Sequence, residues 1–121
     1  IWDTPRIENP GARFENMIAL ELHRAVTLWN DIGYGNFKLH YIKNKERQEV
    51  DFLIVNHQKP FLLIEAKYSN TKHSPALIKF QSMLNIPAVQ LTSSGEHYQL
   101  IPNGAHTILI SSAYRWLANL P

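Results

Sequence analysis

The chain has 121 residues, of which 45% are hydrophobic and 18% charged, and its formal net charge is +2. This length and composition predict one globular domain with its own core and exclude a disordered chain. The absence of cysteine excludes a disulfide scaffold and a thiolate metal site, and no apolar run approaches the ~20 residues of a membrane-spanning helix.

Residues 1–10 are predicted to be an irregular lead-in or linker, because Pro5 and Pro10 disfavour regular structure. The segment lacks the pattern of a signal peptide, so we expect a cytoplasmic protein that makes no contact with a membrane. Position 1 is not Met, which we expect of a piece cut from a longer chain. Residues 11–121 are predicted to form a single domain.

Gly11 to about Asn30 is predicted to be the first helix, ended by a turn that contains Gly33. Apolar side chains recur along one side of it with helical spacing, namely Phe14, Ile18, Leu22, Ala25 and Trp29.

Three strand-like runs follow at 37–42, 49–55 and 61–67, and they are separated by turns at 44–47 and 56–59. Strands that follow one another this closely are typical of an antiparallel meander.

A second helix is predicted over 75–84, and a strand over 88–92 that can pair parallel to the meander. Strands at 98–101 and 107–110 and a short helix at 113–120 complete the chain. The order predicts an α/β fold with an α-β-β-β-α-β core over about 11–92. In it a mixed sheet is flanked by helices, and a C-terminal extension covers 93–121.

Glu65 and Lys67 stand at the end of the third strand-like run, after four large apolar residues. Alternation along a strand points both side chains the same way, roughly 7 Å apart. This pattern fits either a cleft that carries two charges or a salt-bridged strand end in solvent.

Asp51 adds a carboxylate on the preceding strand, and Glu49 is expected on the same face. Acids on adjacent strands beside apolar residues repel one another unless a cation intervenes. Mg²⁺ suits oxygen ligands of this kind. The alternative is that Lys67 or Lys43 neutralises the acids directly.

The first helix can supply a third carboxylate, because Glu15 and Glu21 both flank its apolar side. The spacing alone does not choose between them. Other chemistries have no support: the six histidines lack a zinc-ligand spacing, and neither a P-loop nor a serine-hydrolase motif is present.

Three short segments in this order resemble the core of the PD-(D/E)XK nuclease superfamily. They are Gly11-Ala12-Arg13-Phe14-Glu15-Asn16, Glu49-Val50-Asp51-Phe52 and Leu63-Ile64-Glu65-Ala66-Lys67. The resemblance spans about residues 11–92 and is closest to a domain found C-terminal to the ATPase module of prokaryotic AAA-type ATPases. It implies a restriction-endonuclease-like fold and an upstream ATPase module in the same chain.

The resemblance implies Asp51 and Glu65 as ligands of Mg²⁺ or Mn²⁺, with the backbone carbonyl of Ala66 as a third ligand. It favours Glu15 as the helix carboxylate, which it makes a further metal ligand and catalytic residue. It makes Lys67 the residue that orients or helps to deprotonate the attacking water and offsets charge in the transition state. The implied reaction is hydrolysis of DNA phosphodiesters. The usual Pro-Asp pair is replaced by Val50-Asp51, and Glu49 is an extra acid of this branch.

Three functions therefore remain open: a metal-dependent nuclease, a non-catalytic module that binds DNA or protein on the same fold, and an oligomerisation or regulatory domain of the ATPase. The acidic pair and Lys67 favour the first. The modest net charge favours the other two.

Overall fold

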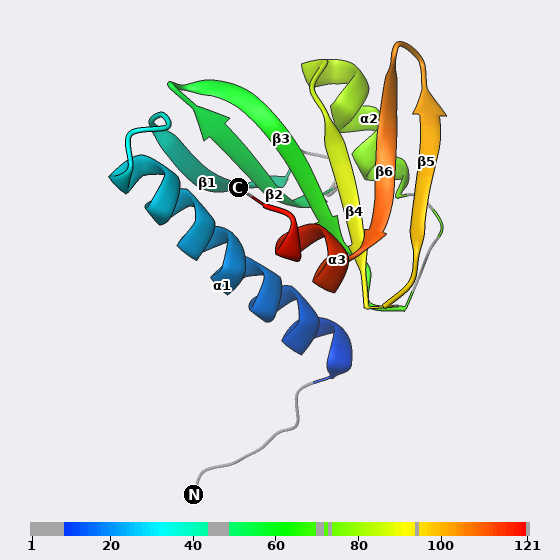
Figure 1. Cartoon of the computed structure of the whole chain (residues 1–121). Coiled ribbons are helices and arrows are strands. Elements are labelled where there is room, and N and C mark those ends of the chain that lie inside the picture. Colours follow the sequence, from blue (N-terminus) through cyan, green and yellow to red (C-terminus); the bar gives the residue numbers. More distant parts are fainter. Residues whose placement is uncertain (1–8, 44–48, 70–71, 73, 94, 121) are drawn as a thin grey trace, which may run out of the picture.

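The computed structural model describes residues 9–43, 49–69, 72, 74–93 and 95–120, and the helices and strands of these residues pack into one α/β fold (Figure 1). In these residues the elements are α1 (Pro10–Asp31), β1 (Phe37–Lys43), β2 (Glu49–Asn56), β3 (Lys59–Ala66), α2 (Pro75–Leu84), β4 (Ala88–Thr92), β5 (Tyr98–Asn103), β6 (His106–Ser112) and α3 (Ala113–Ala118). This confirms the predicted α/β fold. The turn expected at 44–47 and most of the lead-in lie outside the described residues.

All six strands belong to one mixed sheet, in the order β1-β2-β3-β4-β6-β5. The meander β1-β2-β3 is antiparallel and β4 pairs parallel to β3, both as predicted. β6 pairs parallel to β4, and β5 antiparallel to β6. The C-terminal extension expected at 93–121 therefore completes the central sheet, because its strands continue the hydrogen-bonded ladder.

Local sequence explains where the two longer helices begin and end. Asn9 caps α1 by accepting a hydrogen bond from the Ala12 N–H at 2.7 Å, and Ser74 caps α2 in the same way. A proline occupies the first turn of each helix, where its missing N–H costs nothing. Gly33, with a φ of 84°, turns the chain after α1.

The sheet separates two hydrophobic clusters, with α1 and α3 on one face and α2 on the other (Figure 1). Along α1 the buried residues are Phe14, Ile18, Leu22, Val26 and Trp29. Val26 is thus buried, while Ala25, expected on the apolar side, is only partly buried against the cluster. Within the described residues, no helix is long and apolar enough to cross a membrane.

The turn between β2 and β3 is tighter than the four residues predicted for it. His57 and Gln58 both have positive φ, at 52° and 68°, as a two-residue hairpin turn requires. β2 therefore continues to Asn56 and β3 already begins at Lys59. Neither turn residue is the Gly, Asn or Asp that normally indicates this geometry, so the sequence pattern could not predict it.

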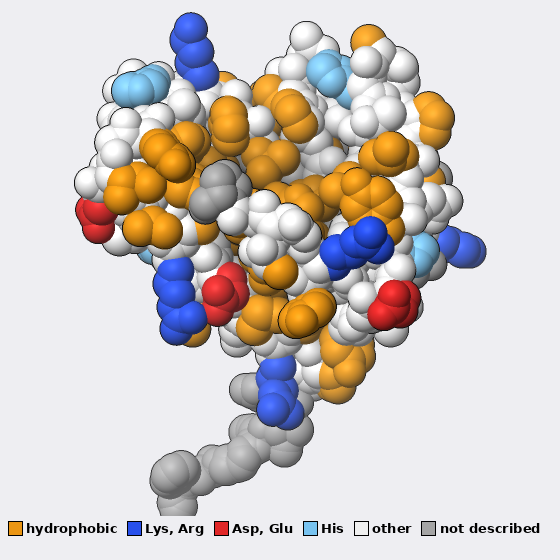
Figure 2. Space-filling view, in the orientation of Figure 1, with side chains coloured by type: hydrophobic (Ala, Val, Ile, Leu, Met, Phe, Trp, Pro, Cys, Tyr) orange, Lys and Arg blue, Asp and Glu red, His pale blue; other side chains and the backbone are white. Residues whose placement is uncertain are grey.

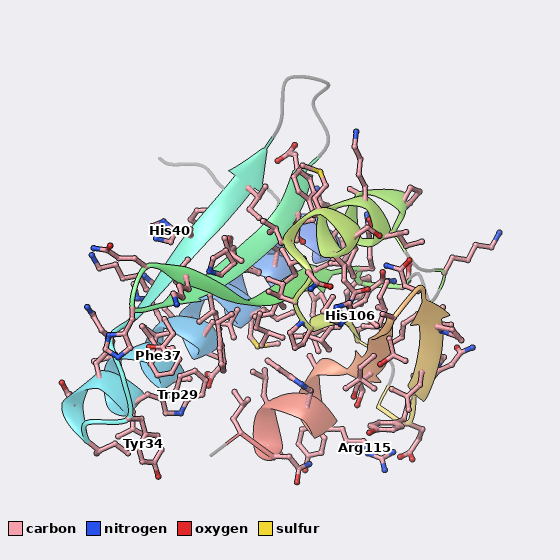
Figure 3. The ribbon with its side chains drawn as sticks, turned by 90° about the horizontal axis from the view of Figure 1, so that it is seen from above. Trp29, Tyr34, Phe37, His40, His106 and Arg115 are labelled. Atoms are coloured by element: carbon pink, nitrogen blue, oxygen red, sulfur yellow. The ribbon has the colours of Figure 1, made fainter. Side chains whose placement is uncertain are left out.

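The end of α1 is tied to β1 by the side chain of Asn30. Its amide nitrogen donates to the Phe37 carbonyl at 2.9 Å, and its oxygen accepts from the Phe37 N–H at 2.7 Å. Beside this contact the rings of Trp29 and Phe37 meet edge to face, 5.2 Å apart between centroids (Figure 3). These two hydrogen bonds hold the start of β1 against the end of α1.

Asn30→Ala is expected to lower the free energy of unfolding by roughly 2 kcal/mol, because two partly buried backbone groups lose their partner. Urea unfolding followed by Trp fluorescence measures this change. Asn16→Ala, at an exposed position of the same helix, is the matched control and should change stability by less than about 0.5 kcal/mol. Equal effects of the two substitutions would contradict a special role for Asn30.

Candidate active site

The candidate site lies where β2 and β3 stop pairing. The last paired residues are Phe52 and Ile64. Their neighbours Asp51 and Glu65 therefore lie just beyond the end of the ladder. On its other side β2 carries an extra residue opposite β1, because the register changes between His40 and Ile42. Such a bulge bends a strand and redirects its side chains.

The effect of the bulge is visible in the core. Phe52 and Ile54 pack on the α1 side of the sheet, whereas Val50 packs on the α2 side with Leu63. Strict alternation would have put Val50 beside Phe52. The irregularity lies next to Asp51, so side chains at the start of β2 no longer follow the alternation of the rest of the strand.

Asp51 and Glu65 hold each other's strands by two reciprocal hydrogen bonds. The Ala66 N–H donates to Asp51 Oδ2 at 2.8 Å, and the Asp51 N–H donates to Glu65 Oε1 at 3.1 Å. Each carboxylate is thus fixed by one backbone donor of the opposite strand, and each retains a second oxygen. The two acids are brought together at the point where the sheet opens.

Lys67 follows β3 directly and points toward the same acids. Its Nζ lies 3.3 Å from Glu65 Oε2, and its side chain is 38% exposed while that of Glu65 is 6% exposed. Its backbone N–H donates to the Leu91 carbonyl of β4 at 2.8 Å. The ammonium group therefore lies between a buried carboxylate and solvent, where a ligand could reach it.

Of the two helix carboxylates, Glu15 is the one beside the strand acids. Its carboxylate is close enough to Asp51, Glu49 and Lys67 for these groups to shift its pKa. Glu21 instead forms a surface ion pair with Arg24 at 2.8 Å, one to two turns farther along α1. The structure thus brings together Glu15, Asp51, Glu65 and Lys67, and leaves Glu21 apart.

Burial disfavours the charged form of all three acids, and the charge of Asp51 adds to this effect at Glu15 and Glu65. Burial, followed by the charge of Asp51, raises the pKa of Glu65 to about 7 and also raises the pKa of Glu15. Burial likewise raises the pKa of Asp51, although the Ala66 N–H and Lys67 act in the opposite direction. Without a cation, the site is electrostatically strained.

The donor set suits a hard cation better than any other group. Carboxylate oxygens of Asp51 and Glu65 are ligands that Mg²⁺ prefers, and Mg²⁺ commonly takes one or two carboxylates and fills its remaining positions with water. In the described part of the chain, no three His, Cys, Asp or Glu side chains are grouped as a complete ligand set. The residues present therefore fit a two-carboxylate Mg²⁺ site, with Glu15 reaching Asp51.

Gln90 supports the site from β4 and was missed from the sequence. It is fully buried and is the register partner of Glu65. Its oxygen accepts from the Ser74 N–H at 2.9 Å and its nitrogen donates to the Lys72 carbonyl at 2.7 Å. It thereby fixes the start of α2 and Lys72 relative to the sheet. A single amide in an otherwise apolar strand was the available signal.

The raised pKa of Glu65 predicts that the metal-free protein becomes less stable as the pH rises from 5 to 8. Folded Glu65 keeps its proton up to about pH 7, whereas the ordinary value is 4.5, so between these values the folded state binds more protons. The free energy of unfolding then falls with rising pH, by up to about 3 kcal/mol.

Urea unfolding of wild type and Glu65→Gln in EDTA at pH 5 and pH 8 measures this dependence. Most of the decrease should disappear in Glu65→Gln and persist in the control Glu21→Gln. An identical pH response of Glu65→Gln and wild type would contradict the assignment.

Comparison with known families returns one match. Residues 10–112, which include the whole site, match the model of a family described as Domain of unknown function (DUF4143). No curated protein and no solved structure is significantly similar to the chain. The description of the family assigns no activity.

Proposed function

We propose that this chain, which belongs to the family described as Domain of unknown function (DUF4143), is a PD-(D/E)XK nuclease-like domain that hydrolyses DNA phosphodiesters with Mg²⁺ or Mn²⁺. One observation carries the proposal: Asp51 and Glu65 are locked together by reciprocal backbone hydrogen bonds, with Lys67 3.3 Å from Glu65. A structural ion pair would need one acid, whereas this site adds two further carboxylates to a single lysine.

In this proposal Asp51 and Glu65 would hold the metal ion, with the Ala66 carbonyl and Glu15, which lies near Asp51, as further ligands. When bound, the metal ion would supply positive charge for the phosphate and lower the pKa of the attacking water. Lys67 orients that water and offsets the negative charge that develops as the new P–O bond forms and the old one breaks. Its partial exposure supports contact with a phosphate.

The alternative is a module that binds DNA or protein, or regulates an attached ATPase, without turnover. Its support is that, in the residues described, no set of three ligating side chains is already assembled. A low net charge of +2 also gives little non-specific attraction to DNA. The resemblance to domains that follow an AAA-type ATPase module is compatible with both the nuclease and the non-catalytic module.

Incubation with supercoiled plasmid and with single-stranded DNA tests the proposal, with Mg²⁺ or Mn²⁺ against EDTA. Metal-dependent nicking that Asp51→Asn removes is the expected result. The same assay on any longer protein that includes this chain, with ATP, covers dependence on an ATPase. If neither protein cuts any form of DNA, hydrolysis is rejected in favour of the binding module.

A further inference from the structure

A groove of about 460 Å³ lies beside the proposed active site, lined by Pro10, Arg13, Phe14 and Tyr68. Two of its lining residues are sequence neighbours of site residues. Phe14 precedes Glu15 on α1, and Tyr68 follows Lys67 after β3. At the end of the molecule where α1 begins, Figure 2 shows a basic side chain close to hydrophobic ones. The groove thus combines aromatic surface with a positive charge.

Tyr68 is held in place by its backbone and by its ring. Its carbonyl accepts from the Ser93 N–H at 3.0 Å, from the Thr92 hydroxyl at 3.3 Å and from the Ser93 hydroxyl. Its ring meets that of Phe14 edge to face, with centroids 5.8 Å apart. The residue nevertheless stays 44% exposed. Tyr68 is therefore held in position while part of it remains accessible to a ligand.

We propose that this groove binds an unpaired nucleotide next to the scissile phosphate, with its base stacked on Tyr68 and its phosphate paired with Arg13. This inference rests on the proposed nuclease function and adds the substrate class. An aromatic ring beside a basic side chain is the pairing that single-strand binding surfaces use. Because Phe14 and Tyr68 are bonded neighbours of Glu15 and Lys67, the groove lies within reach of the proposed site, and a nucleic acid strand is an occupant long enough to contact both.

The stacked base has to be unpaired. In a duplex both faces of each base are already covered by neighbouring pairs, so a tyrosine can stack only on a base that is splayed out or single-stranded. The groove therefore favours single-stranded DNA, a flap or a frayed end over a continuous blunt duplex. Arg13 adds an attraction that is independent of sequence and of strandedness.

Fluorescence anisotropy with labelled oligonucleotides tests the inference, in EDTA so that no cleavage occurs. Wild type should bind a single strand about tenfold more tightly than the blunt duplex of the same sequence. Tyr68→Leu, which keeps an apolar side chain against Phe14, should lose about tenfold in single-strand affinity, and Tyr68→Phe should lose little.

Two further variants separate stacking from charge. Tyr34→Ala removes an exposed tyrosine at the opposite end of α1 and should change nothing (Figure 3). Arg13→Gln should weaken single strand and duplex alike and reduce the salt dependence by about one counterion.

The results distinguish this inference from the proposed activity. Cleavage of DNA without a single-strand preference, or Tyr68→Leu binding as tightly as wild type, overturns the groove and leaves the hydrolase proposal standing. A preference that depends on Tyr68, in a protein that cuts no DNA, supports the groove and overturns hydrolysis. Absence of DNA binding in every form overturns the inference.

Discussion

Lys67→Met is expected to reduce Mg²⁺-dependent DNA cleavage by at least about 100-fold, the typical loss when a group that stabilises transition-state charge is removed. The side chain reaches Glu65 and solvent but contributes no ligand atom. Mg²⁺ affinity should therefore remain largely intact. Single-turnover cleavage measures the first effect, and isothermal titration calorimetry with Mg²⁺ measures the second.

Lys59→Met is the matched control, because Lys59 is an exposed lysine at the opposite end of the same strand. It should cut at the wild-type rate. If Lys67→Met cut as fast as Lys59→Met, the lysine would be only a structural partner of Glu65. If Lys67→Met lost Mg²⁺ binding together with cleavage, its effect would have to be assigned to the metal site.

Asp51→Asn is expected to leave the metal-free protein as stable as wild type, or more stable. The substitution removes a charge that raises the pKa values of both Glu15 and Glu65, while the Asn oxygen can still accept from the Ala66 N–H. Relief of like-charge repulsion then outweighs the loss of a charge-assisted bond. Thermal unfolding in EDTA, with Asp31→Asn at an exposed position as control, measures the difference.

Mg²⁺ should raise the melting temperature of wild type but not that of Asp51→Asn. A ligand present at tenfold excess over its Kd stabilises the folded state by about 1.4 kcal/mol, which corresponds to several degrees in a domain of this size. KCl at matched ionic strength controls for screening. If Asp51 served only as the partner of a lysine, the mutant would be destabilised and neither protein would respond to Mg²⁺.

Most of the fold could be predicted from the sequence because its elements are strongly patterned. The limits of α2 and β4 match the predicted ranges, since Ser74-Pro75 starts the helix and an apolar run fills the strand. The positions at which a strand departs from regular alternation or from the usual turn residues could not be predicted. The turn at His57 and Gln58 and the bulge at the start of β2 break the rules on which the prediction rests.

The charged residues of the candidate site could be predicted from the sequence, but the hydrogen bonds that hold them in place could not. Alternation already put Glu65 and Lys67 on one side, and the family resemblance, not spacing, favoured Glu15 over Glu21. The reciprocal hydrogen bonds of Asp51 depend on how β2 and β3 separate, which no periodicity encodes. Gln90 and Tyr68 form hydrogen bonds with residues distant in sequence. Their roles can therefore be recognised only once the position of β4 is known.

The position of β4 also bears on how the chain folds. β1–β3 and β5–β6 are neighbours in sequence joined by antiparallel pairing, whereas β4 pairs parallel on both sides with strands distant along the chain. Closing long loops costs entropy before contacts repay it, so the two antiparallel units should form early and β4 should join them late. β4 supplies the carbonyl that holds the Lys67 N–H, and Thr92 and the following Ser93 hold the carbonyl of Tyr68. The residues around the carboxylates are thus expected to reach their final positions in the last stage of sheet assembly. Partial separation of β4 from β3 would break these contacts while both antiparallel units are still folded.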